Sequence, residues 1–100
     1  MTYYPDKWCV FQCNNGTDYK VFATWSGGYL SGDSWRTNSC ISKVEETDTH
    51  YIFRGYSGSV YECHKEAYGM TVYGASVLGN IKTLSEEEFK KLDWECITQE

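Results

Sequence analysis

The sequence contains a single proline, Pro5, and no apolar run that approaches the roughly 20 residues a membrane-spanning helix needs. It also lacks an internal repeat, a low-complexity tract and a linker, and 100 residues are too few for two hydrophobic cores. We therefore predict one domain over residues 1–100. The N-terminal stretch has neither the basic flank nor the apolar run of a secretory signal, so we expect a cytoplasmic protein with no membrane partner.

Positive charge is scarce as well. The formal net charge is -5, and the excess is uneven: residues 1–40 are neutral, while residues 41–100 hold eleven acids against six bases. Proteins bind duplex nucleic acid through clustered Lys and Arg, so we predict no duplex partner. A small anion could still be bound locally by one or two basic side chains or by backbone N–H groups.

Catalytic and cofactor motifs are missing too. No Gly-rich phosphate loop ending in Lys-Ser/Thr occurs. Cys63 and His64 are neighbours in a predicted strand, so their side chains point to opposite faces and cannot act as nucleophile and base. The acids at 86–88 are typical of a helix start and those at 45–48 of a solvated turn. We predict a non-enzymatic protein without a cofactor.

The cysteines do not form a metal motif. Zinc is usually held by a tight Cys-x2-Cys pair, whereas Cys9 and Cys13 lie four apart on a predicted strand, about 13 Å along it. Cys63 and His64 supply thiol and imidazole groups but do not shorten that separation, so we predict no metal site. Without an export signal, we expect all five to be reduced and to pack as small hydrophobic residues: Cys9, Cys13, Cys40, Cys63 and Cys96.

Aromatic residues are plentiful, at 17% of the chain. Residues 7–13 alternate in the manner of a strand covered on both faces, and Asn15-Gly16 is typical of a tight type I′ turn. The chain is then expected to return as a second strand over 18–25, with Tyr19, Val21, Ala23 and Trp25 on one face. This pattern predicts a β-hairpin.

Three further strands are predicted: one that begins near Ser34 and runs to Glu45, one over 49–55 and one over 59–64. A short helix over 72–78 closed by Gly79, and a C-terminal helix that starts with a Ser85–Glu88 capping box, follow. We predict an α+β fold: a mostly antiparallel sheet of about five strands, with the short helix and the C-terminal helix packed on one face.

Two stretches combine aromatic rings with glycines and polar donors, the composition of a ligand pocket. In the first, residues 25–39, the aromatic rings could form a wall and the Arg36 guanidinium a clamp for phosphate or carboxylate. The alternative is an irregular loop whose rings plug one end of the sheet. The candidate residues of this stretch are Trp25, Gly28, Tyr29, Ser34, Trp35 and Arg36.

The second stretch, residues 53–74, contains the tight turn Gly55-Tyr56-Ser57-Gly58-Ser59. Successive N–H groups in such a turn can form an anion-binding nest, although an ordinary hairpin turn has the same sequence. The candidate ligand-binding residues here are Arg54, Tyr56, Ser57 and Ser59.

The segments GGYLSGDSWRTNS and GSVYECHKEAYGMTVYG make the chain similar to small accessory proteins of tailed bacteriophages, over roughly residues 18–80. That resemblance implies a protein that counters host defences in the cytoplasm of an infected bacterium, either by blocking a protein complex or by sequestering a nucleotide second messenger. It also implies a homo-oligomer with pockets near an interface.

These observations favour a non-catalytic binding protein that sequesters a small nucleotide-like signal, with aromatic side chains for stacking and arginines for phosphates. A second hypothesis is a protein-binding inhibitor whose acidic surface covers a basic site on a host defence protein. A structural or regulatory phage component is a third.

Overall fold

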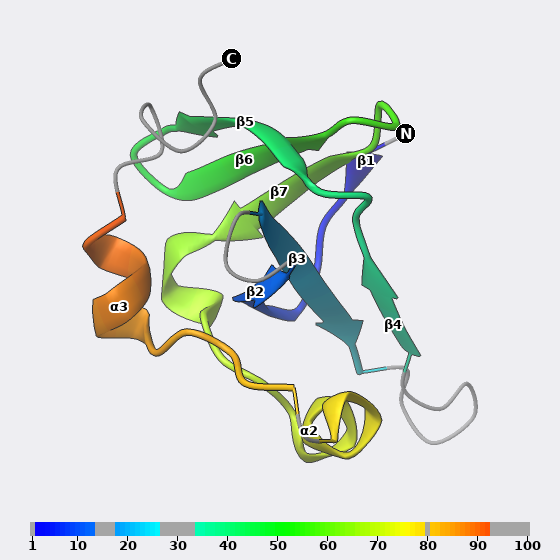
Figure 1. Ribbon diagram of the computed structural model, residues 1–100. Coiled ribbons are helices and arrows are strands. Elements are labelled where there is room, and N and C mark those ends of the chain that lie inside the picture. The colour runs from blue at the N-terminus through cyan, green and yellow to red at the C-terminus, as the bar shows by residue number, and fades with distance from the viewer. Residues whose placement is uncertain (1, 14–17, 27–33, 80, 93–100) are drawn as a thin grey trace.

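The computed structural model describes residues 2–13, 18–26, 34–79 and 81–92, and over these ranges the protein has an α+β fold (Figure 1). The strands are β1 (Thr2–Tyr3), β2 (Lys7–Cys13), β3 (Asp18–Trp25), β4 (Ser34–Thr37), β5 (Ile41–Glu46), β6 (His50–Gly55) and β7 (Val60–His64). The helical segments are the 3-10 helix η1 (Lys65–Ala67) and the α-helices α2 (Val72–Leu78) and α3 (Glu86–Lys90).

The described strands form two sheets instead of the predicted single sheet of about five strands. A four-stranded sheet has the order β1-β7-β6-β5 and a three-stranded sheet the order β2-β3-β4. The predicted strand from Ser34 to Glu45 is divided: β4 stays beside β3, and β5 pairs with β6 in the other sheet. Between them, the buried Asn38 accepts a hydrogen bond from the Val21 N–H through Oδ1 at 3.0 Å, which anchors the crossing to β3.

Strand β1 is absent from the sequence prediction because two residues are too short for a periodic pattern. It pairs in parallel with β7, with Thr2 opposite Val60 and Tyr3 opposite Tyr61. The other strand pairs are antiparallel. This pairing brings the N-terminal segment to the edge of the four-stranded sheet, where Tyr3 becomes part of a cluster described below.

The β2–β3 hairpin is confirmed with its predicted bounds, and its register runs from Lys7 opposite Thr24 to Cys13 opposite Asp18. The predicted turn at Asn14–Thr17 lies outside the described residues. Successive side chains of β2 are buried on alternate faces of the sheet, as the strand prediction requires.

The main core lies between the two sheets. Both sheets contribute to it, and α3 adds Phe89. Its buried members are Trp8, Val10, Tyr19, Val21, Ala23, Ile41, Phe53, Tyr61, Cys63 and Phe89. Tyr19, Val21, Ala23 and the partly buried Trp25 share this face of β3, as predicted.

A smaller core covers the other face of the three-stranded sheet, where Cys9, Phe11 and Phe22 meet Leu78 of α2. The predicted bounds of α2 are confirmed, and Gly79 closes the helix at φ 61°. Gly74 allows the close approach, because a Cβ there would lie 3.1 Å from atoms of Phe22 and Thr24.

The predicted capping box of the last helix is confirmed. The Ser85 side chain accepts a hydrogen bond from the Glu88 N–H, and the Glu88 side chain accepts one from the Ser85 N–H. The backbone of Ser85 and the Ser85 hydroxyl thereby hold the pKa of the Glu88 carboxyl below its usual range. The capping box fixes where α3 begins and so directs Phe89, which is 2% exposed, into the main core.

Candidate functional site

Two of the predicted ligand-binding residues, Trp25 and Arg36, meet on one ring, that of Tyr3. The Arg36 Cζ lies 4.7 Å from the Tyr3 ring centroid, and the Trp25 ring meets the same ring edge-on at 6.2 Å. The Tyr3 ring also stacks on the ring of the buried Tyr61, with 5.0 Å between the two ring centroids. We call these four residues the Tyr3 cluster. Trp25 also donates from Nε1 to the Tyr4 carbonyl at 2.9 Å, so its polar edge has a partner in the protein.

Trp35 does not join this cluster. Residues 35 and 36 are neighbours in β4, so their side chains lie on opposite faces of the sheet. The Trp35 ring stacks on Phe22 at 5.8 Å, on the face that α2 covers, and is 47% exposed. The predicted wall of Trp25 and Trp35 beside Arg36 is therefore divided between two faces. Ser34, opposite Trp25 at the start of β4, is exposed.

The turn between β6 and β7 uses its N–H groups within the protein. Gly55 donates to the Ser59 carbonyl at 2.9 Å and Gly58 to the Gly55 carbonyl at 3.0 Å. Tyr56 donates to the Cys40 carbonyl at 3.2 Å, and Ser57 to the hydroxyl of Ser39 at 3.0 Å. These four donors have acceptors, so they do not form the predicted anion nest. The Gly55 and Gly58 bonds close the turn itself, and those of Tyr56 and Ser57 bind it to the β4–β5 connection.

Two more of the predicted site residues, Arg54 and Tyr56, lie at or next to this turn. Arg54 lies on β6, where its Nε donates to Glu45 at 2.7 Å across the β5–β6 pair. This hydrogen bond is the largest influence on the pKa of the Glu45 carboxyl, and it lowers that pKa. The Tyr56 ring is 65% exposed at the turn. Gly28 and Tyr29 lie outside the described residues.

A hollow whose lining is typical of a ligand pocket lies elsewhere, beside η1 and α3. It has a volume of about 340 Å³, and its lining joins four aromatic residues to four charged ones: Trp8, Tyr51, Lys65, Glu66, Tyr68, Glu86, Phe89 and Lys90. We call it the aromatic hollow. Its size is at the small end of the range of ligand pockets, about 300–1,000 Å³.

The floor of the aromatic hollow is a set of rings in mutual contact. Trp8 lies 4.8 Å from Tyr68 and 5.2 Å from Phe89, both edge-on, and Tyr51 meets Phe89 at 5.0 Å. Trp8 and Phe89 are at most 2% exposed, while Tyr51 and Tyr68 are partly exposed. The floor is therefore fixed by the main core, and the two tyrosines present surface for contact with a ligand.

Hydrogen bonds hold the rings in place. Trp8 Nε1 donates to the His64 carbonyl at 2.7 Å. The Tyr68 hydroxyl donates to the Leu84 carbonyl at 2.7 Å and accepts from the Val10 N–H at 3.3 Å. Burial is the main reason that the pKa of the Tyr68 phenol is raised, so the hydroxyl remains a neutral donor. Such preorganisation lowers the entropy cost of binding.

The rim carries charges of both signs. The Lys65 Nζ lies 5.2 Å from the Tyr51 ring centroid and 2.6 Å from Glu46, whose hydrogen bond is the main cause of the raised Lys65 pKa. Lys90 lies 3.5 Å from Glu86. A cationic side chain thus stands directly beside a partly exposed ring, as Arg36 does at Tyr3.

A second hollow, of about 460 Å³, lies where β2 meets residues 81–84, and no aromatic residue lines it. None of the predicted site residues lines either hollow. The sequence offered partial signals for the aromatic hollow, since Trp8 and Tyr51 lie in predicted strands and Phe89 in a predicted helix. Lys65 and Tyr68, between β7 and α2, had no periodic signal.

Fold and hollow together define a small α+β fold with an aromatic-floored cavity. Searches against protein-family models, curated proteins and solved structures gave no match to this chain. Among the described residues, no helix has the length and apolar character required to cross a membrane.

Proposed function

We propose that this protein is a non-catalytic binding protein that captures a small, planar, nucleotide-like anion in the aromatic hollow. The observation that supports it is the meeting of four aromatic residues and two lysines around one cavity. Stacking on a base-like ring is worth about 1–3 kcal/mol and tolerates chemical variation, because every base has a π face. This proposal moves the site from the predicted residues around Arg36 to Tyr51, Tyr68 and Lys65.

The volume of the hollow limits the ligand. About 340 Å³ accommodates one ring system with a single charged substituent better than a dinucleotide. Lys65 is the group that would meet a phosphate, because its Nζ already lies at the Tyr51 ring. A bound phosphate would compete with Glu46 for this ammonium group, so we expect modest affinity that weakens as salt is added.

Capture without turnover fits the composition of the hollow. Its lining contains two carboxylates, two ammonium groups and two phenols, but no histidine or cysteine. The phage resemblance suggests the biological setting, in which removal of a nucleotide signal from the infected cell's cytoplasm would silence a host defence.

The alternative function, an acidic surface that blocks a host defence protein, requires uncompensated negative charge. Glu45 and Glu46 are each within 2.7 Å of a basic nitrogen, on Arg54 and Lys65 respectively. These ion pairs reduce the bare charge of the turn that the alternative would use, so we favour ligand capture.

Homo-oligomerisation belongs to the same proposal. Strands β4 and β5 end their sheets, and neither has a second neighbouring strand among the described residues. Trp35 lies on the β4 edge strand and is 47% exposed. An open edge beside an exposed ring suits pairing with a second copy, and light scattering would measure the mass in solution.

The test is ligand recovery. The protein is incubated with a panel of cyclic nucleotides and ADP-ribose derivatives, washed, and heated to release what it holds. We expect one class of compound to be recovered intact. Tyr51→Leu and Lys65→Gln should each weaken its binding about tenfold, the loss of roughly 1.4 kcal/mol expected for one stacking or ionic contact. Calorimetric titration measures this change.

Arg36→Gln and Trp35→Leu are the matched controls, since neither residue lines the aromatic hollow. Both should bind within about twofold of the unsubstituted protein. If these two variants lost binding while Tyr51→Leu kept it, the site would be at β3–β4 and the proposed hollow would be rejected. Recovery of a chemically altered compound would indicate an enzyme.

A further inference from the structure

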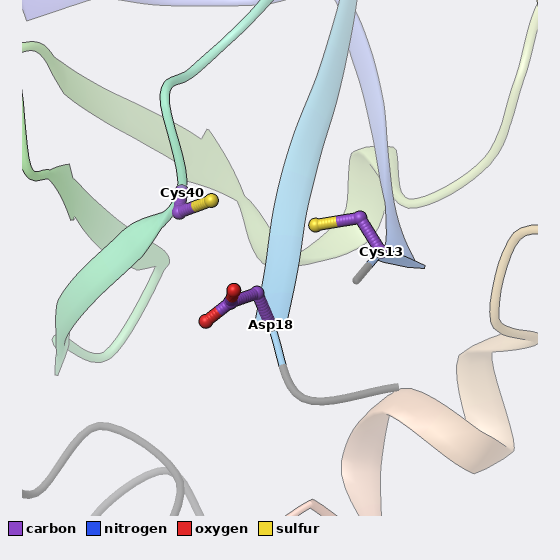
Figure 2. A group of neighbouring side chains, drawn as sticks. All are labelled: Cys13, Asp18 and Cys40. Carbon is purple, nitrogen blue, oxygen red and sulfur yellow. The ribbon is translucent and has the colours of Figure 1, made fainter. Parts of the chain in front are cut away.

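A cluster of metal-ligand side chains lies away from the aromatic hollow, where the two sheets meet. Cys13 ends β2, and Asp18 begins β3 directly opposite it in the hairpin register. Cys40 comes from the β4–β5 connection, one residue before β5. The two sulfur atoms and a carboxylate oxygen all lie within 4.8 Å of one another, and Figure 2 shows both thiols pointing toward each other above the Asp18 carboxylate.

We propose that Cys13, Asp18 and Cys40 form a zinc site that joins the two sheets. Zinc bonds of about 2.3 Å to sulfur and 2.0–2.2 Å to oxygen place tetrahedral ligand atoms roughly 3.5–3.8 Å apart. The observed limit of 4.8 Å closes to that spacing through side-chain movements of about an ångström. All three residues are partly exposed, so a metal ion can enter and a water molecule can complete the tetrahedron.

The ligand set selects among metals. Two thiolates favour zinc over magnesium and calcium, which prefer oxygen ligands. The carboxylate has two oxygens, so it can bind the metal through one and leave the other for a further partner. The prediction of no metal site rested on the spacing of Cys9 and Cys13 within one strand. Cys13 and Cys40 are 27 positions apart and come together only through the crossing from β4 to β5.

A disulfide between Cys13 and Cys40 is the competing explanation for two neighbouring thiols. Asp18 favours the metal, because a third ligand strengthens cation binding but contributes nothing to a disulfide. Zinc binds thiolates, so its binding would release the thiol protons of Cys13 and Cys40.

The experiment uses the full chain, reduced and then dialysed against buffered zinc. We expect one zinc per chain by elemental analysis, and thiolate charge-transfer and tetrahedral d–d bands when cobalt(II) replaces zinc. Cys13→Ser, Cys40→Ser and Asp18→Asn should each weaken binding at least about tenfold. The matched controls are Cys9→Ala, which removes a buried thiol outside the cluster, and Asp48→Asn, which alters an exposed turn carboxylate. Both should retain zinc within about twofold.

A second measurement needs no variant. Zinc should slow alkylation of Cys13 and Cys40 by at least about tenfold, as followed by peptide mass spectrometry, because a coordinated thiolate is a poorer nucleophile. Equal alkylation with and without zinc, zinc retained by the Cys13→Ser and Cys40→Ser variants, or a Cys13–Cys40 disulfide in protein whose reduced form takes up no zinc would each overturn the proposal. Ligand capture by the aromatic hollow is assayed separately, so either result can fail alone.

Discussion

The Tyr3 cluster and the aromatic hollow are built from the same residue types and differ in what the rings contact. In the Tyr3 cluster, the Arg36 guanidinium covers the Tyr3 ring at 4.7 Å, and Tyr3 in turn stacks on Tyr61. In the aromatic hollow, a cavity of about 340 Å³ remains above partly exposed tyrosines. The first arrangement uses its ring faces within the protein, whereas the second leaves ring surface for a ligand.

The difference shows that an aromatic-rich sequence predicts ring clusters but does not predict where space remains between them. Trp25 and Arg36 do meet, as the ligand-pocket hypothesis required, but the ring between them is Tyr3 from β1. Their cluster joins the two sheets, because β1 belongs to one and β3 and β4 to the other. We therefore expect substitutions in the Tyr3 cluster to change stability and those in the hollow to change binding.

Substitution of Phe89 should change stability as well as binding, because Phe89 belongs to both the main core and the aromatic hollow. Phe89→Ala should lower the free energy of unfolding by about 3–5 kcal/mol, because it deletes a buried ring that contacts Trp8, Tyr51 and Tyr68. Denaturant titration measures this loss.

Phe89→Leu is the control, because it keeps most of the apolar volume and should cost less than about 1.5 kcal/mol. If Phe89→Ala were as stable as Phe89→Leu, α3 would not be packed on the main core in solution.

The loss of stability at alkaline pH tests whether Tyr61 is buried in the Tyr3 cluster. Burial, the largest cause, raises the pKa of this phenol to about 12, with the Arg36 charge acting in the opposite direction. The folded state thus retains the proton more strongly than the unfolded chain. The contribution of Tyr61 to the free energy of unfolding is constant below about pH 10 and is lost as the pH rises from about 10 to 12.

Tyr61→Phe keeps the ring and removes the ionisable group. We expect it to flatten the alkaline decline in unfolding free energy by on the order of 1–2 kcal/mol, with part of the decline left because burial also raises the pKa of Cys9 to about 12. The matched control is Tyr56→Phe in the exposed turn. An alkaline profile that Tyr61→Phe leaves unchanged would mean that Tyr61 is hydrated in the folded protein.

Arg36 gives the smallest expected effect. Arg36→Met should lower the free energy of unfolding by about 0.5–1 kcal/mol, since it removes one exposed cation–π contact and keeps an apolar chain over Tyr3. Thermal unfolding at low and high salt measures it. Loss of ligand binding in this variant with unchanged stability would reverse our assignment of the two regions.

The elements that the sequence predicted with their observed bounds depend on local signals. The β2–β3 hairpin follows from period-two alternation, α2 from a helical run closed by Gly79, and the start of α3 from the Ser85–Glu88 capping box. The strand expected from Ser34 to Glu45 shows the limit of this reasoning. Nothing in its alternation indicates that Asn38 is buried against Val21 and turns the chain into a second sheet.

The candidate site was predictable in part. The alternation that predicts a strand at Ser34 also places Trp35 and Arg36 on opposite faces, so the sequence already argued against their joint use. The meeting of Tyr51 on β6, Lys65 on η1 and Phe89 on α3 had no such signal. Tyr51 and Phe89 each have a local pattern that accounts for them alone, Lys65 has none, and only the packing of the three elements creates a cavity.

The sequence by itself determined the α+β character, the hairpin, the helix starts and the burial of alternate residues, because hydrogen bonding and side-chain periodicity within a few residues decide them. The tertiary structure decided the division into two sheets, the parallel pairing of Thr2–Tyr3 with β7, and the gathering of Cys13, Asp18 and Cys40. These features join segments far apart in the chain, so they depend on which apolar faces pack against each other, and no local pattern records that choice.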